Sequence, residues 1–80
     1  MKATGATPAD QARSLGLVVG DTIEGRGRDH AVRLTLLWIG SELVVWRYAS
    51  RMDFEPWRDY GEDSDWDLER YDWTKVEVQR

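Results

Sequence analysis

The most constraining feature of this sequence is the apolar run at residues 31–48, AVRLTLLWIGSELVVWRY. The run is rich in β-branched and aromatic residues and is interrupted once, by Gly40, Ser41 and Glu42. Two such runs joined by a short polar segment with a glycine are typical of a β-hairpin. Because a chain of 80 residues has room for only one hydrophobic core, this hairpin is predicted to be the scaffold of the fold.

Within the first half of the hairpin, apolar and polar residues alternate from Val32 to Trp38, which predicts one buried face. Leu37 and Ile39 break this alternation. Both faces of the far end of this strand are therefore predicted to be covered, as strong coiling or closure of a barrel would require.

The segments around the hairpin predict short elements. Thr7, Pro8 and Asp10 are typical of a helix start, and Gly16 of a helix end, so a helix is predicted over residues 7–15. Alternating residues predict three further strands, at residues 17–24, 65–69 and 74–79. The remaining segments are predicted as a flexible loop at 25–29, a long loop at 49–64 and one helical turn at 70–73.

Five short strands with a helical turn before the last predict an all-β or small α+β domain, a five-stranded SH3-like antiparallel barrel or sheet with a short N-terminal helix. This domain is predicted to span residues 7–80, after a disordered N-terminal segment at residues 1–6. An OB-like barrel is the alternative. It normally needs a helix between its third and fourth strands, and the proline, glycine and acids of residues 50–64 argue against one.

Composition narrows the chemistry that is open to the chain. Cysteine is absent, which excludes disulfides, thiolate catalysis and cysteine-based zinc sites. The first residues have no apolar core of signal-peptide length, and no window approaches the ~18 apolar residues of a membrane span. We therefore expect an intracellular protein without membrane contact.

The acidic residues are concentrated in one segment. Residues 53–72 hold nine acids against two bases, a local net charge of −7, whereas the other residues sum to +3. Aromatic residues are interleaved with these acids, and such a surface attracts a basic partner and repels nucleic acid. The predicted partner-binding residues are Asp53, Glu55, Trp57, Asp59, Tyr60, Glu62, Asp63, Asp65, Asp67 and Glu69. The alternative is an acidic, solubilising face with Trp57 and Trp66 in the core.

The spacing of Asp63, Asp65 and Asp67 suggests two roles. Alternate carboxylates on a strand stand roughly 6.5–7 Å apart, a spacing close to that of successive phosphates, so this row is predicted to mimic DNA in a basic groove. The same spacing occurs in calcium loops, but the required glycine and glutamate are replaced by Leu68 and Thr74. No metal site and no cofactor are therefore predicted.

No catalytic residues are predicted, and the protein is not expected to be an enzyme. His30, the only histidine, lies beside Asp29, but neighbouring residues on a strand point to opposite faces. No serine has a recognisable nucleophile spacing, so His30 is interpreted as a surface residue.

A second hypothesis is a small nucleic-acid-binding barrel. Glycines near residues 25–27 would let the backbone approach phosphates, and nearby arginines would bind them. The residues of this alternative site are Arg26, Arg28, Arg33 and Arg47. The negative net charge of the chain opposes this hypothesis.

Several stretches between residues 15 and 78 resemble a group of small proteins carried by phages and prophages: GLVVGDTIEGRG, RLTLLWIG, VVWR and WDLERYDWTKV. Within that group, the chain is similar to anti-CRISPR inhibitors directed at a type I surveillance complex. The type of complex that the resemblance indicates is type I-C. The resemblance implies a non-enzymatic inhibitor in the host cytoplasm, monomeric or homodimeric, that keeps the complex from engaging target DNA. It transfers no individual functional residue.

A structural phage module that assembles with itself through exposed tryptophans and hairpin edges is the third hypothesis.

Overall fold

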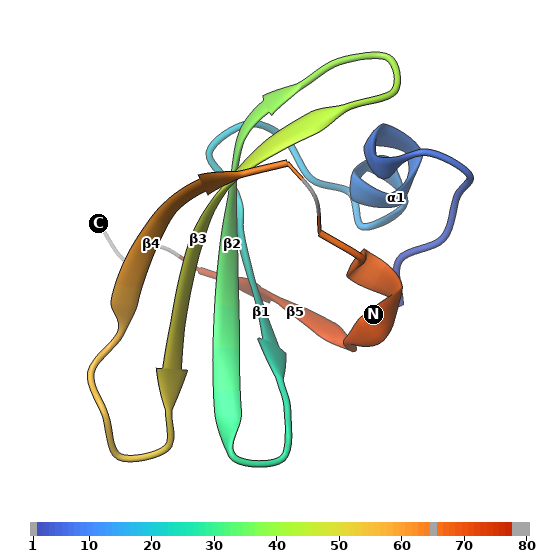
Figure 1. The fold of residues 1–80 in the computed structure, drawn as a ribbon. Coiled ribbons are helices and arrows are strands. Elements are labelled where there is room, and N and C mark those ends of the chain that lie inside the picture. The colour runs from blue at the N-terminus through green and yellow to red at the C-terminus, as the bar shows by residue number, and fades with distance from the viewer. Residues whose placement is uncertain (1, 65, 78–80) are drawn as a thin grey trace.

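The computed structural model describes residues 2–64 and 66–77. These residues form a short α-helix, five strands and one 3-10 helix. In chain order the elements are α1 (Pro8–Ser14), β1 (Thr22–Arg26), β2 (His30–Ile39), β3 (Val44–Met52), β4 (Arg58–Asp63), η1 (Leu68–Arg70) and β5 (Trp73–Val76). The strands form one antiparallel sheet in the order β4-β3-β2-β1-β5 (Figure 1).

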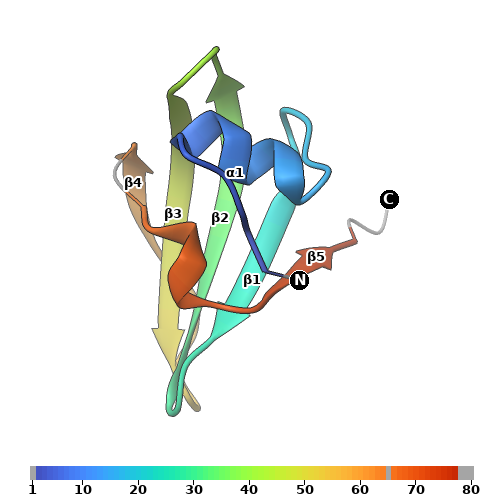
Figure 2. The same cartoon turned by 90° about the vertical axis from the view of Figure 1, so that its right-hand side faces the viewer.

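The connectivity is SH3-like, because the first four strands form a meander and β5 returns after η1 to pair with β1. The barrel is not closed, and β4 and β5 are the two edges of the sheet. Both α1 and η1 lie on the same, concave side of the sheet (Figure 2). The structure thus confirms the predicted all-β fold with five antiparallel strands and a short N-terminal helix.

The helix α1 begins and ends at the predicted signals. The Thr7 Oγ1 atom accepts a hydrogen bond of 3.1 Å from the backbone N–H of Asp10, as an N-cap residue does. After Ser14 the chain turns at Gly16, whose φ of 71° lies in the left-handed region that glycine tolerates. No helix among the residues described has both the length and the apolar character that crossing a membrane requires.

The core lies between α1 and the concave face of the sheet. Its largest fully buried side chains come from η1 and from every strand except β4: Trp46, Trp73, Ile23, Leu34, Leu36, Leu68 and Val44. Ala9 and Ala12 of α1 are completely buried against them. Ala3 also lies in this core, and the backbone N–H of Thr4 donates to Ser14 Oγ at 2.9 Å, so residues before the helix pack on it.

The break in alternation within β2 is a β-bulge. The pairing of β2 with β3 shifts by one residue between Leu36 and Trp38. Because of this shift, Ile39 packs against the core, while Leu37 and Trp38 have 36% and 53% of their surface exposed. The prediction that both faces are covered at this end of the strand is therefore wrong.

The fourth strand is not where the sequence predicts it. Residues 58–63, predicted as part of a long loop, form β4, and the predicted strand at 65–69 is replaced by η1 over Leu68–Arg70. The Asp67 side chain accepts a hydrogen bond from the backbone N–H of Glu69, which favours the helical turn over a strand. Gly61 permits β4 to bend, since its φ of 88° accompanies a register shift against β3.

Three other elements have different bounds in the structure than the sequence predicts: the first strand, the helical turn and the last strand. The first strand begins at Thr22 rather than at residue 17, because Asp21 accepts a hydrogen bond from the backbone N–H of Val18 and ties residues 18–21 into a turn. The helical turn comes at Leu68–Arg70, before the predicted 70–73. The last strand is observed over Trp73–Val76, and the end of its predicted range, residues 78–79, lies outside the described residues.

The core makes a matched prediction possible at two leucines. Leu34 on β2 is completely buried, whereas Leu43 in the β2–β3 turn has 61% of its surface exposed. We expect Leu34→Ala to lower the free energy of unfolding by about 2–5 kcal/mol, because it leaves a cavity. Leu43→Ala should change it by no more than about 0.5 kcal/mol. Urea unfolding followed by tryptophan fluorescence measures both, and equal effects would contradict this description of the core.

Candidate functional site

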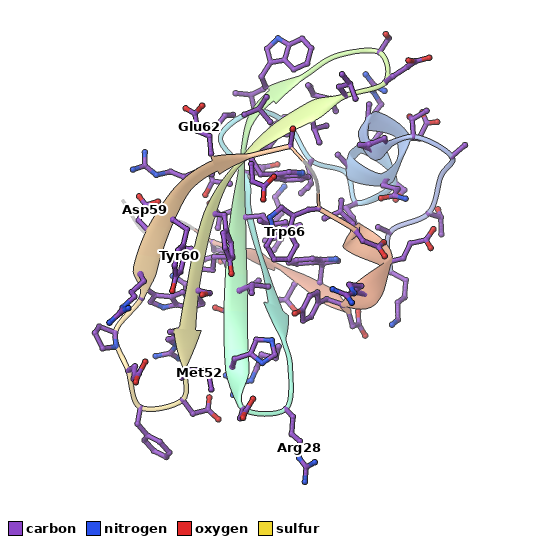
Figure 3. All side chains as sticks on the ribbon, viewed as in Figure 1. Arg28, Met52, Asp59, Tyr60, Glu62 and Trp66 are labelled. Atoms are coloured by element: carbon purple, nitrogen blue, oxygen red, sulfur yellow. The ribbon has the colours of Figure 1, made fainter. Side chains whose placement is uncertain are left out.

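The predicted contact residues that the structure describes lie on the loop after β3, on β4 and on the segment that leads into η1. Figure 3 shows Asp59, Tyr60 and Glu62 on β4, the edge strand of the sheet. The structure describes nine of the ten residues, and these fall into three groups: carboxylates paired with arginines, a tryptophan that contacts arginines, and exposed residues.

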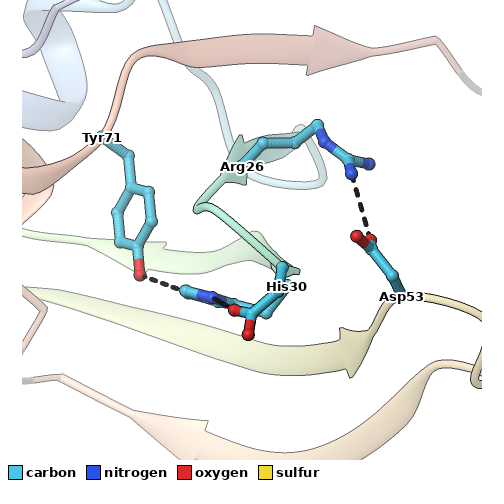
Figure 4. Close-up of polar contacts among 5 residues, drawn as sticks. Arg26, His30, Asp53 and Tyr71 are labelled. Carbon is cyan, nitrogen blue, oxygen red and sulfur yellow. Dashed lines mark hydrogen bonds and ion pairs between the residues drawn. The ribbon is translucent and has the colours of Figure 1, made fainter.

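Two of the carboxylates form ion pairs. Asp53 Oδ1 lies 3.1 Å from Arg26 Nη2 (Figure 4), and Arg47 Nε donates to Asp59 Oδ2 at 2.8 Å. The hydrogen bond from Arg47 lowers the pKa of the Asp59 carboxyl below its ordinary value, and the backbone N–H of Gly61 adds to this effect. These two carboxylates are therefore partly neutralised within the chain.

Trp57 lies outside the core and is half-buried against two arginine side chains. The guanidinium of Arg33 lies 4.4 Å from the centroid of its ring and that of Arg51 lies 5.1 Å away. Arg33 follows the buried Val32 along β2, so its side chain and the Trp57 ring lie on the face of the sheet opposite the core. Trp66 is partly buried and packs against the core.

The remaining described members of the predicted surface are exposed: Glu55, Tyr60, Glu62, Asp63, Asp67 and Glu69. Asp65 lies outside the described residues. Because β4 ends at Asp63 and η1 begins at Leu68, Asp63 and Asp67 are not on one strand. Asp63 and Asp67 therefore do not belong to the predicted row of carboxylates on one strand.

The arginines of the alternative nucleic-acid site do not form an unpaired basic patch. Arg33 Nε lies 2.9 Å from Glu24 Oε1, and the ion pairs of Arg26 and Arg47 are described above. Arg28 is exposed in the loop between β1 and β2 (Figure 3). Three of the four arginines thus have a carboxylate as their nearest partner.

The third hypothesis, assembly of the protein with itself, rests on exposed apolar residues near the turn between β2 and β3. Trp38 and Leu37 are exposed at the end of β2, and Leu43 is exposed in the turn that follows. Trp38 pairs with Val45 of β3, which lines a surface depression together with Glu62 and Asp63.

The structure also contains a cleft that sequence reasoning missed. It has a volume of about 400 Å³, and its lining includes Val32 and Tyr48, which belong to or pack against the core. We call it the aromatic cleft, and it is lined by His30, Val32, Tyr48, Ser50, Arg51, Met52, Glu55, Pro56, Arg58, Tyr60, Trp66 and Tyr71. Its floor is formed by residues of β2 and β3. Its walls are formed by residues between 55 and 60, which lead into β4, and by Trp66 and Tyr71 on either side of η1.

Aromatic rings form a continuous surface in this cleft. The ring of Tyr48 on β3 stacks on Tyr60 of β4 at a centroid distance of 5.1 Å and packs against Trp66 at 4.8 Å. These contacts join three segments of the chain. Tyr48 and Tyr60 would have indicated the cleft, had residues 58–63 been recognised as a strand that pairs with β3.

His30 is part of the cleft rather than an isolated surface residue. Its Nε2 atom lies 3.1 Å from the hydroxyl of Tyr71 and its Nδ1 atom 3.4 Å from Asp29 Oδ1 (Figure 4). The His30–Tyr71 contact ties the start of β2 to the segment before β5. Among residues 2–64 and 66–77, no group of three or more His, Asp or Glu side chains is placed to hold a metal ion.

Comparison with known proteins adds no relative. No protein-family model matches the chain, and no curated protein or solved structure gives a significant match. The resemblance to phage-encoded inhibitors stays a prediction.

The Arg47–Asp59 pair predicts a specific dependence on pH. Because the pKa of Asp59 is lower in the folded than in the unfolded chain, the pair stabilises the fold above the unfolded pKa of about 4. This contribution is lost as the pH falls through the folded pKa.

We therefore expect Asp59→Asn to reduce the loss of stability between about pH 5 and about pH 2, measured as the urea midpoint of unfolding. Arg47→Gln should flatten the profile in the same way, since it removes the donor. Profiles parallel to that of the unmodified protein would show that the pair does not form in solution.

Proposed function

We propose that this protein is a non-enzymatic inhibitor of host defence that binds a basic surface of a protein partner. The contact is made by the exposed acids of β4 and η1 together with Tyr60. The partner class comes from the resemblance of the sequence to anti-CRISPR proteins, which points to a type I surveillance complex, of type I-C. Binding there keeps the complex from engaging target DNA.

The observation that carries this proposal is the position of the exposed acids. After Asp53 and Asp59 have formed ion pairs with arginines, Glu62 and Glu69 remain exposed on the edge strand and on the turn that follows it. Counted over the whole segment 53–72, nine acids and two bases give a net charge of −7. Such a surface complements a groove rich in lysine and arginine and speeds association with it.

The edge position of β4 adds to this complementarity. One side of β4 pairs with β3, and the other is an edge of the sheet. The acids and the bend at Gly61 discourage pairing with the edge strand of another copy. They leave the same edge accessible to a positively charged partner.

Charge reversal tests the proposal. We expect Glu62→Lys combined with Glu69→Lys to weaken binding to a purified type I-C surveillance complex by about tenfold or more, and to restore its binding of target DNA. Glu42→Lys combined with Glu77→Lys is the matched control, because both residues are exposed outside the site and the change in net charge is the same. Binding is measured by biolayer interferometry at several salt concentrations. Equal losses in the two double variants, or no loss in either, would contradict the proposed surface.

The ion pairs within the protein also predict that it does not bind nucleic acid. Since Arg26, Arg33 and Arg47 are paired with carboxylates, we expect no retention of DNA or RNA in a mobility-shift assay at low salt. Retention that weakens steeply with added salt would favour the nucleic-acid-binding hypothesis instead.

A further inference from the structure

We propose that Trp38 is an apolar anchor of the contact with the protein partner, and that the partner receives it in an apolar pocket bordered by lysine or arginine side chains. This inference rests on the proposed function for the existence of a basic partner surface. It adds an apolar component to the contact, at the end of the sheet where β2 and β3 meet their turn. We call the residues of this component the anchor patch: Leu37, Trp38 and Val45.

The bulge in β2 turns Trp38 toward solvent. Leu36 is completely buried, and the register shift that follows it places Trp38 opposite Val45 of β3. Val45 lies between two buried residues along β3, so its side chain and that of Trp38 lie on the face of the sheet opposite the core. Trp38 is therefore exposed although β2 is a central strand. Bulges of this kind are common where a strand directs a side chain toward a functional site.

The exposed indole is also held in place. Its six-membered ring packs over Gly40 so closely that a Cβ atom at position 40 would clash with it. Gly40 is itself fixed, because its backbone N–H donates to the carbonyl of Leu43 at 2.8 Å and its carbonyl accepts a hydrogen bond from the guanidinium of Arg13. A tryptophan whose position is set before binding loses little conformational freedom when a partner covers it. Tryptophans are also among the residues that most often dominate the binding energy of an interface.

Acidic side chains border the anchor patch and indicate the chemistry of its occupant. Val45 lines a surface depression with Glu62 and Asp63, and Figure 3 shows Glu62 near the end of β4. Residues 59–63 hold three acids and no base. Arg47, on the neighbouring part of β3, donates to Asp59 Oδ2 at 2.8 Å, so its charge is offset within the protein. A partner that covers Trp38 therefore meets negative charge at the border, which lysine or arginine complements.

The same charges disfavour a second copy of this chain as the occupant. A two-fold symmetric dimer through the anchor patch would bring together Glu62 and Asp63 of both copies, and like charges that face each other across an interface oppose association. We therefore expect sedimentation velocity to show a monomer as the concentration of the protein is raised. A dimer that Trp38→Ala dissociates would overturn the inference in favour of self-assembly.

Binding kinetics with the purified type I-C surveillance complex test the anchor. We expect Trp38→Ala to raise the dissociation rate by about tenfold or more, and to leave the salt dependence of association unchanged, because it removes apolar area and no charge. Phe54→Ala is the matched control, since Phe54 is an exposed aromatic residue beyond the opposite end of β3. It should change neither quantity. A dissociation rate that Trp38→Ala leaves unchanged, or that both variants raise equally, would overturn the inference.

A second variant displaces the ring without removing it. We expect Gly40→Ala to move the indole N–H resonance of Trp38 in a nuclear magnetic resonance spectrum, because the added Cβ atom clashes with the outer end of that side chain rather than with the backbone. The dissociation rate should rise by about threefold or more, and by less than in Trp38→Ala. A displaced resonance with an unchanged dissociation rate would contradict the role of the held ring.

A short peptide tests the anchor patch without the surveillance complex. We expect a blocked peptide of alternating leucine and lysine to shift the indole N–H resonance of Trp38 in a titration of the full chain. The same peptide with glutamate in place of lysine should shift it much less. Equal shifts with the two peptides, or none with either, would overturn the inference.

The two sets of experiments separate this inference from the proposed function. If the surveillance complex loses the Glu62→Lys, Glu69→Lys variant but holds Trp38→Ala as tightly as the unmodified protein, this inference fails alone. If the lysine peptide shifts Trp38 but the complex does not bind the protein, the proposed function fails, and the anchor patch stands as a site for a basic protein surface with an apolar pocket. If neither the complex nor the peptide binds, both fail.

Discussion

The burial of two tryptophans determines how the rest of this small fold is arranged. Trp46 on β3 and Trp73 on β5 are completely buried on the concave side of the sheet, and large aromatic side chains of this kind bury about 150–250 Å² each. The indole N–H of Trp73 donates to the backbone carbonyl of Leu68 at 2.7 Å, which fixes η1 against the last strand. These contacts bring the C-terminal part of the chain back to the hairpin and allow β5 to pair with β1.

The limited size of this core also explains the cleft. The seven residues of α1 cover one part of the concave face, and Ala9 and Ala12 bring the helix close to the sheet. The other part is filled only by partly buried aromatic residues, among them Tyr48, Trp66 and Tyr71. An opening lined by rings therefore follows from a sheet that is larger than the helix that covers it.

Charges are used in two different ways on this scaffold. On the face opposite the core, arginines pair with acids and stack on Trp57, so that positive and negative side chains largely cancel there. Along β4 and η1 the exposed acids exceed the bases, and the charge of the segment is left to act on its surroundings. The same segment contributes residues to the walls of the aromatic cleft.

The sequence by itself determined the strand count, the central hairpin, the N-terminal helix and the acidic segment. These features depend on local patterns: the alternation around Leu34, the cap at Thr7 and the composition of residues 53–72. Only the tertiary structure decided where the fourth strand lies, which acids are paired and where the cleft opens. Those outcomes depend on cross-strand partners, since Tyr60 and Asp59 become part of a strand through Tyr48 and Arg47 of β3. A linear pattern does not contain these partners until the register of the strands is known.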